Sequence, residues 1–152
     1  VAVLRRRQKA IVTEIFMFAA ICMATLFVYG TNTNVITPES IGLWLLNTLF
    51  IASAVFTIKL RKVKTSSLKG GLVYHCVAIA LTATLYSIGW LSLFTALTFG
   101  VALLKLAVVI LFRDWYCNSR FVYIARFETY FALTYTALAC LTVLPEYLPV
   151  PG

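Results

Sequence analysis

The sequence predicts an all-helical membrane protein: a bundle of about five transmembrane helices. A mean hydropathy of +0.94 and a hydrophobic fraction of 62% leave too little polar surface for a soluble domain of 152 residues. The 13 Lys and Arg residues, apart from Lys105, fall in three short stretches that alternate with long apolar runs. This alternation is typical of a chain that crosses a membrane several times.

Five apolar segments come close to the roughly 20 residues that a helix needs to cross a hydrocarbon core about 30 Å thick. They are residues 10–30, 41–58, 72–88, 91–112 and 127–144. Before the second segment, Thr37, Pro38 and Glu39 supply a capping hydroxyl, a proline and an acid in the order that favours a helix start. We therefore expect the second helix to begin there.

The stretch between residues 72 and 112 is too long for one span. As a single helix it would measure about 60 Å, twice the hydrocarbon core. We expect the chain to reverse at Ser87–Trp90. The segment Arg113–Arg126 is compatible with either an interfacial helix or an extension of the fifth span, and the aromatic and basic cluster at Arg113–Tyr116 with either an interface anchor or a site for a lipid or partner.

The basic stretches Arg5–Lys9, Lys59–Lys69 and Arg113–Arg126 all fall on the same side of the predicted membrane. Because basic residues in short loops stay in the cytoplasm, the N-terminus is predicted to lie inside and the C-terminus outside. The net charge of +8 is then explained by topology and by attraction to anionic headgroups. No nucleic-acid recognition module is visible, so the predicted partners are membrane lipids and other membrane-protein subunits, with no nucleic acid.

Ionisable groups at membrane depth are costly and tend to mark a site or a buried pair. Lys105, Glu14 and Glu128 are all expected in the cytoplasmic half of the membrane, so Lys105 is predicted to pair with Glu14 or Glu128. In the structural interpretation this is a helix-packing ion pair or a lysine that snorkels toward water. In the functional interpretation it belongs, with Arg120 and Arg126, to a polar cleft that holds an anionic headgroup or substrate.

His75 is the single histidine, near the cytoplasmic start of the third predicted helix. A neutral imidazole there could ligate a haem iron or the magnesium of a chlorin, or hydrogen-bond to a neighbouring helix. No second ligand has matching spacing, and the four cysteines form no CxxC pair, so no metal site is predicted. The sequence also lacks a phosphate-binding loop, GxSxG and HExxH, so no catalytic residue is predicted and a non-enzymatic role is favoured.

The start of the chain has two interpretations. The apolar residues Val1–Leu4, directly before the basic stretch, look like the tail of an earlier helix. The chain would then be the C-terminal part of a longer protein, with Arg5–Lys9 forming a tight cytoplasmic turn. The alternative is a trimmed or partly disordered N-terminus. In the first case, the missing part could supply catalytic groups.

Four short motifs, spread over most of the chain, invite comparison with a known family. They are Arg5–Ala10, Ser40–Leu46, Val55–Arg61 and Arg113–Tyr116. In these motifs and in hydropathy the chain resembles the YwiC-like family of bacterial multi-pass membrane proteins, which includes cyanobacterial members. The Lys-Glu-His-Gly-Ala-Trp-like signature of that family is absent here. The resemblance implies a bacterial cytoplasmic or thylakoid membrane and no established activity.

The predicted function is that of an accessory or lipid-contacting subunit of a membrane complex. One alternative is an intramembrane prenyl- or lipid-transferase, because the chain is loosely similar to intramembrane prenyltransferases, although their Asp-rich motifs are missing. Another alternative is a small carrier that uses Lys105 and the nearby acids. No internal repeat of the kind common in carriers is visible.

Overall fold

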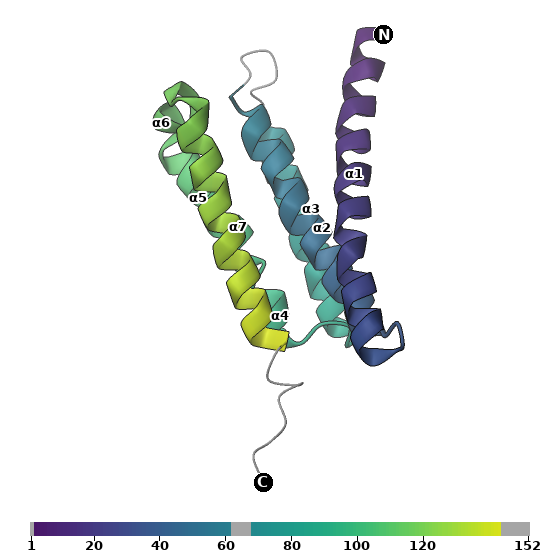
Figure 1. Cartoon of the computed structure of the whole chain (residues 1–152). Helices are drawn as coiled ribbons and strands as arrows, with labels where there is room; N and C mark the ends of the chain where they lie inside the picture. The colour runs from purple at the N-terminus through teal and green to yellow at the C-terminus, as the bar shows by residue number, and fades with distance from the viewer. Residues whose placement is uncertain (1, 62–67, 144–152) are drawn as a thin grey trace. The chain divides into compact units, whose positions relative to one another are not determined.

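The computed structural model describes residues 2–61 and 68–143, with side chains for residues 13–31, 34–61 and 68–143. Within these ranges the regular secondary structure is helical throughout, as predicted (Figure 1). Two compact units divide the chain: unit 1, Val1–Leu91, holds α1 to α3, and unit 2, Ser92–Gly152, holds α4 to α7. Lys62 and Lys64 of the second basic stretch, and Leu144 at the end of the fifth predicted span, lie outside the described residues.

Four segments of the described chain are long and apolar enough to cross a membrane, judged by length and composition. They are Thr13–Thr31, Pro38–Lys59, Leu68–Ser87 and Leu93–Leu111. The fifth predicted span lies in a long helix, α7 (Phe121–Val143). That helix is not among the four, because Arg126, Glu128 and several Tyr and Thr residues lower its hydropathy. A fifth crossing therefore stays a prediction.

Unit 1 consists of α1 (Ala2–Thr33), α2 (Pro38–Lys59) and α3 (Leu68–Ser87). Each helix runs antiparallel to the one before it, and α2 packs against both α1 and α3. The start of α1, the end of α2 and the start of α3 therefore lie at the same end of the unit (Figure 1). Because α2 has a neighbour on two sides, it carries most of the buried side chains of this unit. We call this end, which carries Lys59, Arg61 and Lys69, the basic end of unit 1.

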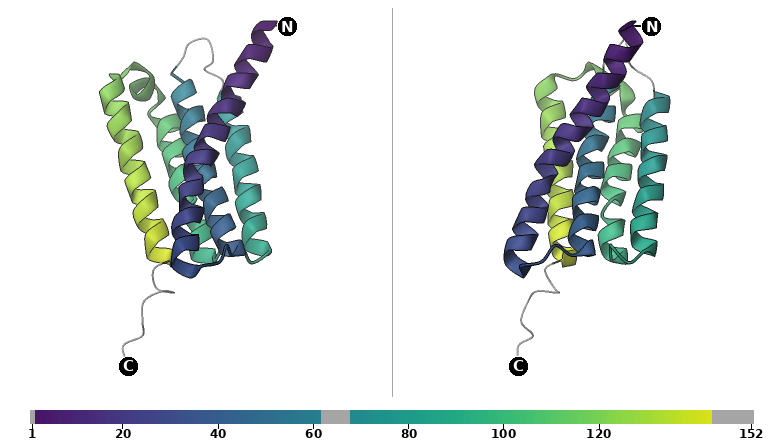
Figure 2. Two further views of the ribbon diagram at one scale, coloured as in Figure 1. Left: turned by 45° about the vertical axis from the view of Figure 1, so that its right-hand side comes forward. Right: turned by 90° about the vertical axis from the view of Figure 1, so that its right-hand side faces the viewer.

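The first helix is longer than predicted. At about 1.5 Å per residue, its 32 residues span about 48 Å, well beyond a hydrocarbon core. Its N-terminal turns extend past the ends of α2 and α3 (Figure 2). The predicted tight turn at Arg5–Lys9 is wrong, because these residues continue the helix. Arg, Gln, Lys and Ala are all good helix formers, and no Gly or Pro interrupts the run before Gly30.

The predicted start of the second helix is confirmed. Thr37 has an extended backbone and its hydroxyl accepts a hydrogen bond from the Ser40 amide at 3.4 Å. Pro38 occupies the first turn, where its missing N–H costs nothing, and Glu39 lies near the positive end of the helix dipole. The local sequence is therefore sufficient to fix this boundary.

A turn at the predicted place after the third helix is also confirmed. Gly89 has φ of 78°, a left-handed conformation that costs glycine little. Its amide donates to the Tyr86 carbonyl at 3.0 Å, and the Trp90 amide donates to the Leu85 carbonyl at 2.9 Å. These two hydrogen bonds form a Schellman motif, which closes the carbonyl end of α3.

In unit 2 the predicted span 91–112 is interrupted. It consists of α4 (Leu93–Leu97) and α5 (Gly100–Leu111), separated at Thr98 and Phe99. The Thr98 amide bonds the Thr95 carbonyl at 3.2 Å, three residues back, so the turn is tighter than an α-helix. The Thr98 hydroxyl also bonds the Thr95 carbonyl, at 2.6 Å, which competes with the regular helical pattern.

The sequence allowed the segment Arg113–Arg126 to be either an interfacial helix or an extension of the fifth span, and the structure has features of both. A short helix, α6 (Arg113–Asn118), follows a break at Phe112, and α7 then begins at Phe121. The start of α4 and the end of α7 are joined by a hydrogen bond between the hydroxyls of Thr95 and Thr142 at 3.2 Å. The end of α5, α6 and the start of α7 thus bring Arg113, Arg120 and Arg126 to one end of the unit (Figure 1).

Candidate functional site

Helix α5 places a lysine on its buried face. The residues buried with it, which follow helical spacing along one side of α5, are Val101, Ala102, Leu106 and Val109. The side chain of Lys105 is only 1% exposed. An ammonium group in such surroundings is costly unless a carboxylate compensates it, so the partner of Lys105 defines the site.

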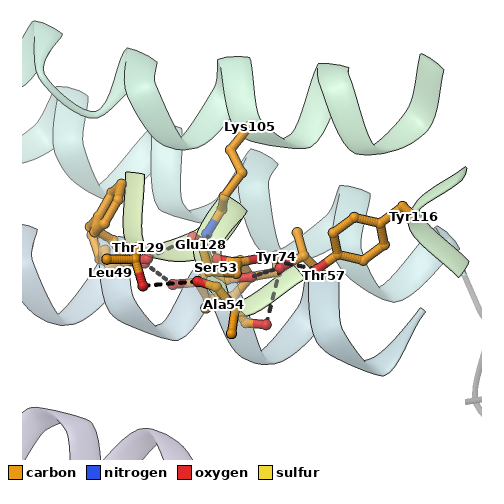
Figure 3. Close-up of polar contacts among 11 residues, drawn as sticks. Leu49, Ser53, Ala54, Thr57, Tyr74, Lys105, Tyr116, Glu128 and Thr129 are labelled. Atoms are coloured by element: carbon orange, nitrogen blue, oxygen red, sulfur yellow. Dashed lines mark hydrogen bonds and ion pairs between the residues drawn. The ribbon is translucent and has the colours of Figure 1, made fainter. Parts of the chain in front are cut away.

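That partner is Glu128 of α7. The Lys105 Nζ atom lies 3.0 Å from Glu128 Oε2, and the hydroxyl of Tyr116 donates to Glu128 Oε1 at 3.1 Å (Figure 3). Both oxygens of one carboxylate are therefore engaged, one by a cation and one by a neutral donor. Of the two partners that the sequence allowed for Lys105, the structure has Glu128.

Helix α6 turns Tyr116 toward this carboxylate. Tyr116 is buried, and the ring of Phe127 lies edge-on to it with centroids 5.8 Å apart. The Phe127 ring also lies next to that of Phe131, with centroids 4.7 Å apart. Sequence reasoning missed this role, because Tyr116 stands in an aromatic and basic segment that resembles an interface anchor. We call Lys105, Glu128 and Tyr116 the buried cluster.

Glu14 belongs to a different pair. Its Oε2 atom lies 2.9 Å from Nζ of Lys59, which joins α1 to α2 near the basic end of unit 1. The side chains are 44% and 21% exposed, respectively, so this pair is far more open than the buried cluster. The predicted alternative, in which Glu14 is the partner of Lys105, is therefore wrong. Nothing in the sequence singled out Lys59, which was counted with the topology-setting basic residues.

Arg120 and Arg126 were predicted to join Lys105 in one anionic site. Both side chains are exposed, and in the described residues neither forms a hydrogen bond or ion pair with the buried cluster. Arg126 lies on α7 two residues before Glu128, and side chains at that spacing point to different faces of a helix. Lys105 is therefore buried and paired with Glu128, whereas Arg120 and Arg126 are exposed and lie outside that site.

His75 lies on α3 in unit 1 and is 2% exposed. Its Nδ1 atom is 2.7 Å from the carbonyl oxygen of Gly71. Because a carbonyl can only accept, Nδ1 carries the ring proton in a neutral imidazole, which leaves Nε2 as the nitrogen that could ligate a metal. The Tyr74 ring lies edge-on to the imidazole at 5.4 Å. Ligation of a haem or chlorin at His75 stays a prediction.

The described residues contain no cluster of metal-ligating side chains. No group of three or more His, Cys, Asp or Glu residues lies close enough to hold an ion, within the described ranges. The hydroxyls in the helices instead bond to carbonyls three or four residues back, as Thr48 does to Trp44 at 2.8 Å and Thr82 to Ala78 at 2.9 Å. Such hydroxyls are satisfied within their own helix, as a membrane requires.

Comparison of the chain with protein families, with curated proteins and with solved structures gives no match. The resemblance to the YwiC-like family therefore stays a prediction from short motifs. Function has to be argued from the geometry of the buried cluster and from the distribution of charged and apolar side chains.

Proposed function

We propose that the chain is a five-span integral membrane protein, with its N-terminus inside and its C-terminus outside, that serves as a lipid-contacting accessory subunit of a membrane complex. The observation that carries the proposal is the closed buried cluster. Lys105 and Glu128, the groups best suited to bind a charged substrate, are engaged with each other, and Tyr116 occupies the second carboxylate oxygen. The cluster thereby joins α5, α6 and α7.

The charge distribution supports the proposed orientation. In unit 1, Lys59, Arg61 and Lys69 gather at one end. In unit 2, Arg113 and Arg120 lie at the end where α5 leads into α6 and α7. From the basic end of unit 1, α3 would cross the membrane once, and the span formed by α4 and α5 would cross it back. These two crossings would bring α6 to the same side of the membrane as the basic end of unit 1. Basic residues of both units would then be cytoplasmic.

The apolar surface supports contact with lipid. Large hydrophobic side chains are exposed on α1, α3 and α7, including Phe16, Phe27, Val73, Val77 and Leu133. A soluble protein would bury most of such a surface, whereas lipid tails are as apolar as these side chains. A bundle with outward apolar faces on several helices suits a small membrane subunit.

Cysteine labelling in intact cells tests the topology. In a background without the native cysteines, Val35→Cys and Ile88→Cys should react with an impermeant maleimide from outside. Lys69→Cys and Asn118→Cys should react only after permeabilisation. Glu146→Cys should label from outside if α7 crosses the membrane, and only after permeabilisation if it does not.

Purification in nanodiscs from native membranes, followed by mass analysis, tests the subunit role. Protein partners in fixed stoichiometry are expected. A lone protein that carries an isoprenoid diphosphate would instead favour the lipid-transferase alternative.

A carrier is the second candidate, and one observation favours it. The predicted fourth span is broken between α4 and α5, and broken membrane helices often border transport sites. The buried cluster follows that break on α5. A carrier of this kind would lose its flux in Lys105→Met while its assembly with partners remained intact. A structural cluster predicts the reverse, with assembly weakened and no flux to lose.

A further inference from the structure

We propose that the outward stripe of α7 formed by Tyr123, Arg126 and Tyr130 binds the phosphate of an anionic phospholipid at the cytoplasmic surface of the membrane. The inference rests on the proposed function, because it requires α7 to lie in the membrane with its start inside. The three residues are spaced by three and four positions, so they share one face of the helix. We call them the tyrosine-arginine stripe.

The stripe is open. Tyr123 is 54% exposed, Tyr130 is 67% exposed and Arg126 is exposed as well. The residues that α7 buries, Ile124 and Tyr135, lie on its other side, together with Glu128 of the buried cluster. Helix α7 therefore presents the charge of Glu128 to its neighbours and the charge of Arg126 to its surroundings.

The charge of the stripe is uncompensated within the described residues. The one carboxylate of α7, Glu128, is engaged with Lys105, and no described ion pair involves Arg126. An exposed arginine on a membrane helix is costly unless an anion meets it. The pairing of Glu128 with Lys105 thus leaves Arg126 available for an external anion.

The chemistry of the three side chains fits a phosphate. A guanidinium group presents two parallel N–H donors to a phosphate, and this two-bond contact is stronger and more directional than the contact of a lysine ammonium. Tyrosine hydroxyls on either side add donors, and tyrosine rings prefer the membrane interface. The positive charge of Arg126 also suits the anionic lipids of a cytoplasmic leaflet.

The depth of Arg126 is appropriate for a headgroup. It lies five residues after Phe121, where α7 begins, so its Cα is about 8 Å from that end of the helix. An arginine side chain can extend over this distance to the headgroup region while its methylene groups stay in the apolar layer.

Native mass spectrometry of the purified full chain with phosphatidylglycerol and phosphatidylcholine tests the proposal. The wild type should retain phosphatidylglycerol selectively. Arg126→Gln should lower that retention roughly tenfold, the loss of one bidentate charge-assisted contact. Arg126→Lys keeps the charge without the fork and should fall between the two. Lys69→Gln removes another exposed basic residue, outside the stripe, and should retain the lipid as the wild type does.

Two outcomes would overturn the proposal. Equal retention by Arg126→Gln and Lys69→Gln would mean that the lipid recognises net charge and not the stripe. If Arg126→Gln lost a copurifying protein while it kept phosphatidylglycerol, the stripe would dock an acidic partner instead. A failure of the lipid site with α7 still crossing the membrane, as Glu146→Cys labelling reports, would leave the proposed topology intact.

Discussion

Among the described residues, each unit has one lysine-glutamate ion pair, and the two pairs are almost equal in length but differ in how far they are exposed. The Nζ to Oε2 distance is 2.9 Å for Lys59 and Glu14 in unit 1, and 3.0 Å for Lys105 and Glu128 in unit 2. The unit 1 lysine and glutamate are 21% and 44% exposed, against 1% and 16% in unit 2. The same contact therefore has different consequences. Glu14 and Lys59 lie at or next to the ends of the candidate spans Thr13–Thr31 and Pro38–Lys59, where a charge that loses its partner can reach water, whereas the buried Lys105 cannot.

Unit 1 joins its helices mainly through neutral contacts. The Trp44 indole donates to the Ala19 carbonyl at 2.9 Å, and the Asn47 amide donates to the Thr25 hydroxyl at 3.1 Å. At the turn after α3, a Cβ added to Gly42 would lie 2.6 Å from the Trp90 carbonyl oxygen. Close backbone approach and hydrogen bonds hold unit 1, whereas buried charge holds unit 2.

The largest predicted effect is that of Glu128→Gln. The variant leaves the Lys105 ammonium buried without a counter-charge, and we expect a loss of about 3–5 kcal/mol in the free energy of unfolding. Denaturation in detergent, followed by circular dichroism, measures it. The double variant Lys105→Met with Glu128→Gln should recover most of the loss, because it removes both charges. A loss below about 1 kcal/mol in the single variant would contradict the buried pairing.

In unit 1 the most sensitive position should be Gly42. Gly42→Ala forces the added methyl group against the Trp90 carbonyl, which belongs to the backbone and cannot rotate away. Overpacking of this kind costs about 1–3 kcal/mol. Gly70→Ala is the matched control, because nothing lies within 4 Å of its added Cβ, and it should be neutral or slightly stabilising. Equal effects of the two variants would show that the turn does not pack on α2.

Tyr116→Phe sharpens the comparison within unit 2. It removes one hydrogen bond to Glu128 but keeps the aromatic contact with Phe127. A hydrogen bond to a charged group contributes about 1.5 kcal/mol, so we expect a loss of that order by the same denaturation assay. Tyr123→Phe, on the exposed side of α7, should leave the free energy of unfolding unchanged. A neutral Tyr116→Phe would indicate that water or another donor replaces the phenol.

The smallest predicted effect is that of Glu14→Gln. Exposed ion pairs contribute roughly 0–1 kcal/mol, and salt screens them. We expect a loss below about 1 kcal/mol that shrinks further at high ionic strength. Measuring the variant and the wild type at low and high salt checks this. An effect as large as that of Glu128→Gln would mean that environment does not distinguish the two pairs.

Local signals predicted two helix boundaries correctly. Thr37, Pro38 and Glu39 mark the start of α2, and Gly89 marks the end of α3, because caps and turns depend on neighbouring residues. The break between α4 and α5 was missed, although Thr95, Thr98 and Gly100 in an apolar run were a signal for it. The many hydrophobic residues of this run made a continuous helix the simpler prediction, although the Thr98 hydroxyl can compete with backbone amides for the Thr95 carbonyl.

The site was predictable only in part, because pairing across helices depends on tertiary contacts. The predicted depth in the membrane allowed either Glu14 or Glu128 as the partner of Lys105. The packing of α5 against α7 places Glu128 beside Lys105, and the packing of α1 against α2 places Glu14 beside Lys59. Arg126 was predicted to share a site with Lys105, yet its face of α7 points elsewhere. Helical spacing from Glu128 could have shown this before the structure.

Double-mutant cycles on both pairs test the central claim most directly. The first cycle combines Lys105→Met with Glu128→Gln, and the second combines Lys59→Met with Glu14→Gln, each measured as a free energy of unfolding in the same detergent. We expect a coupling energy of about 2 kcal/mol or more for Lys105 and Glu128 and below about 1 kcal/mol for Lys59 and Glu14. Equal couplings, or a larger one for Lys59 and Glu14, would show that burial does not set the strength of these ion pairs.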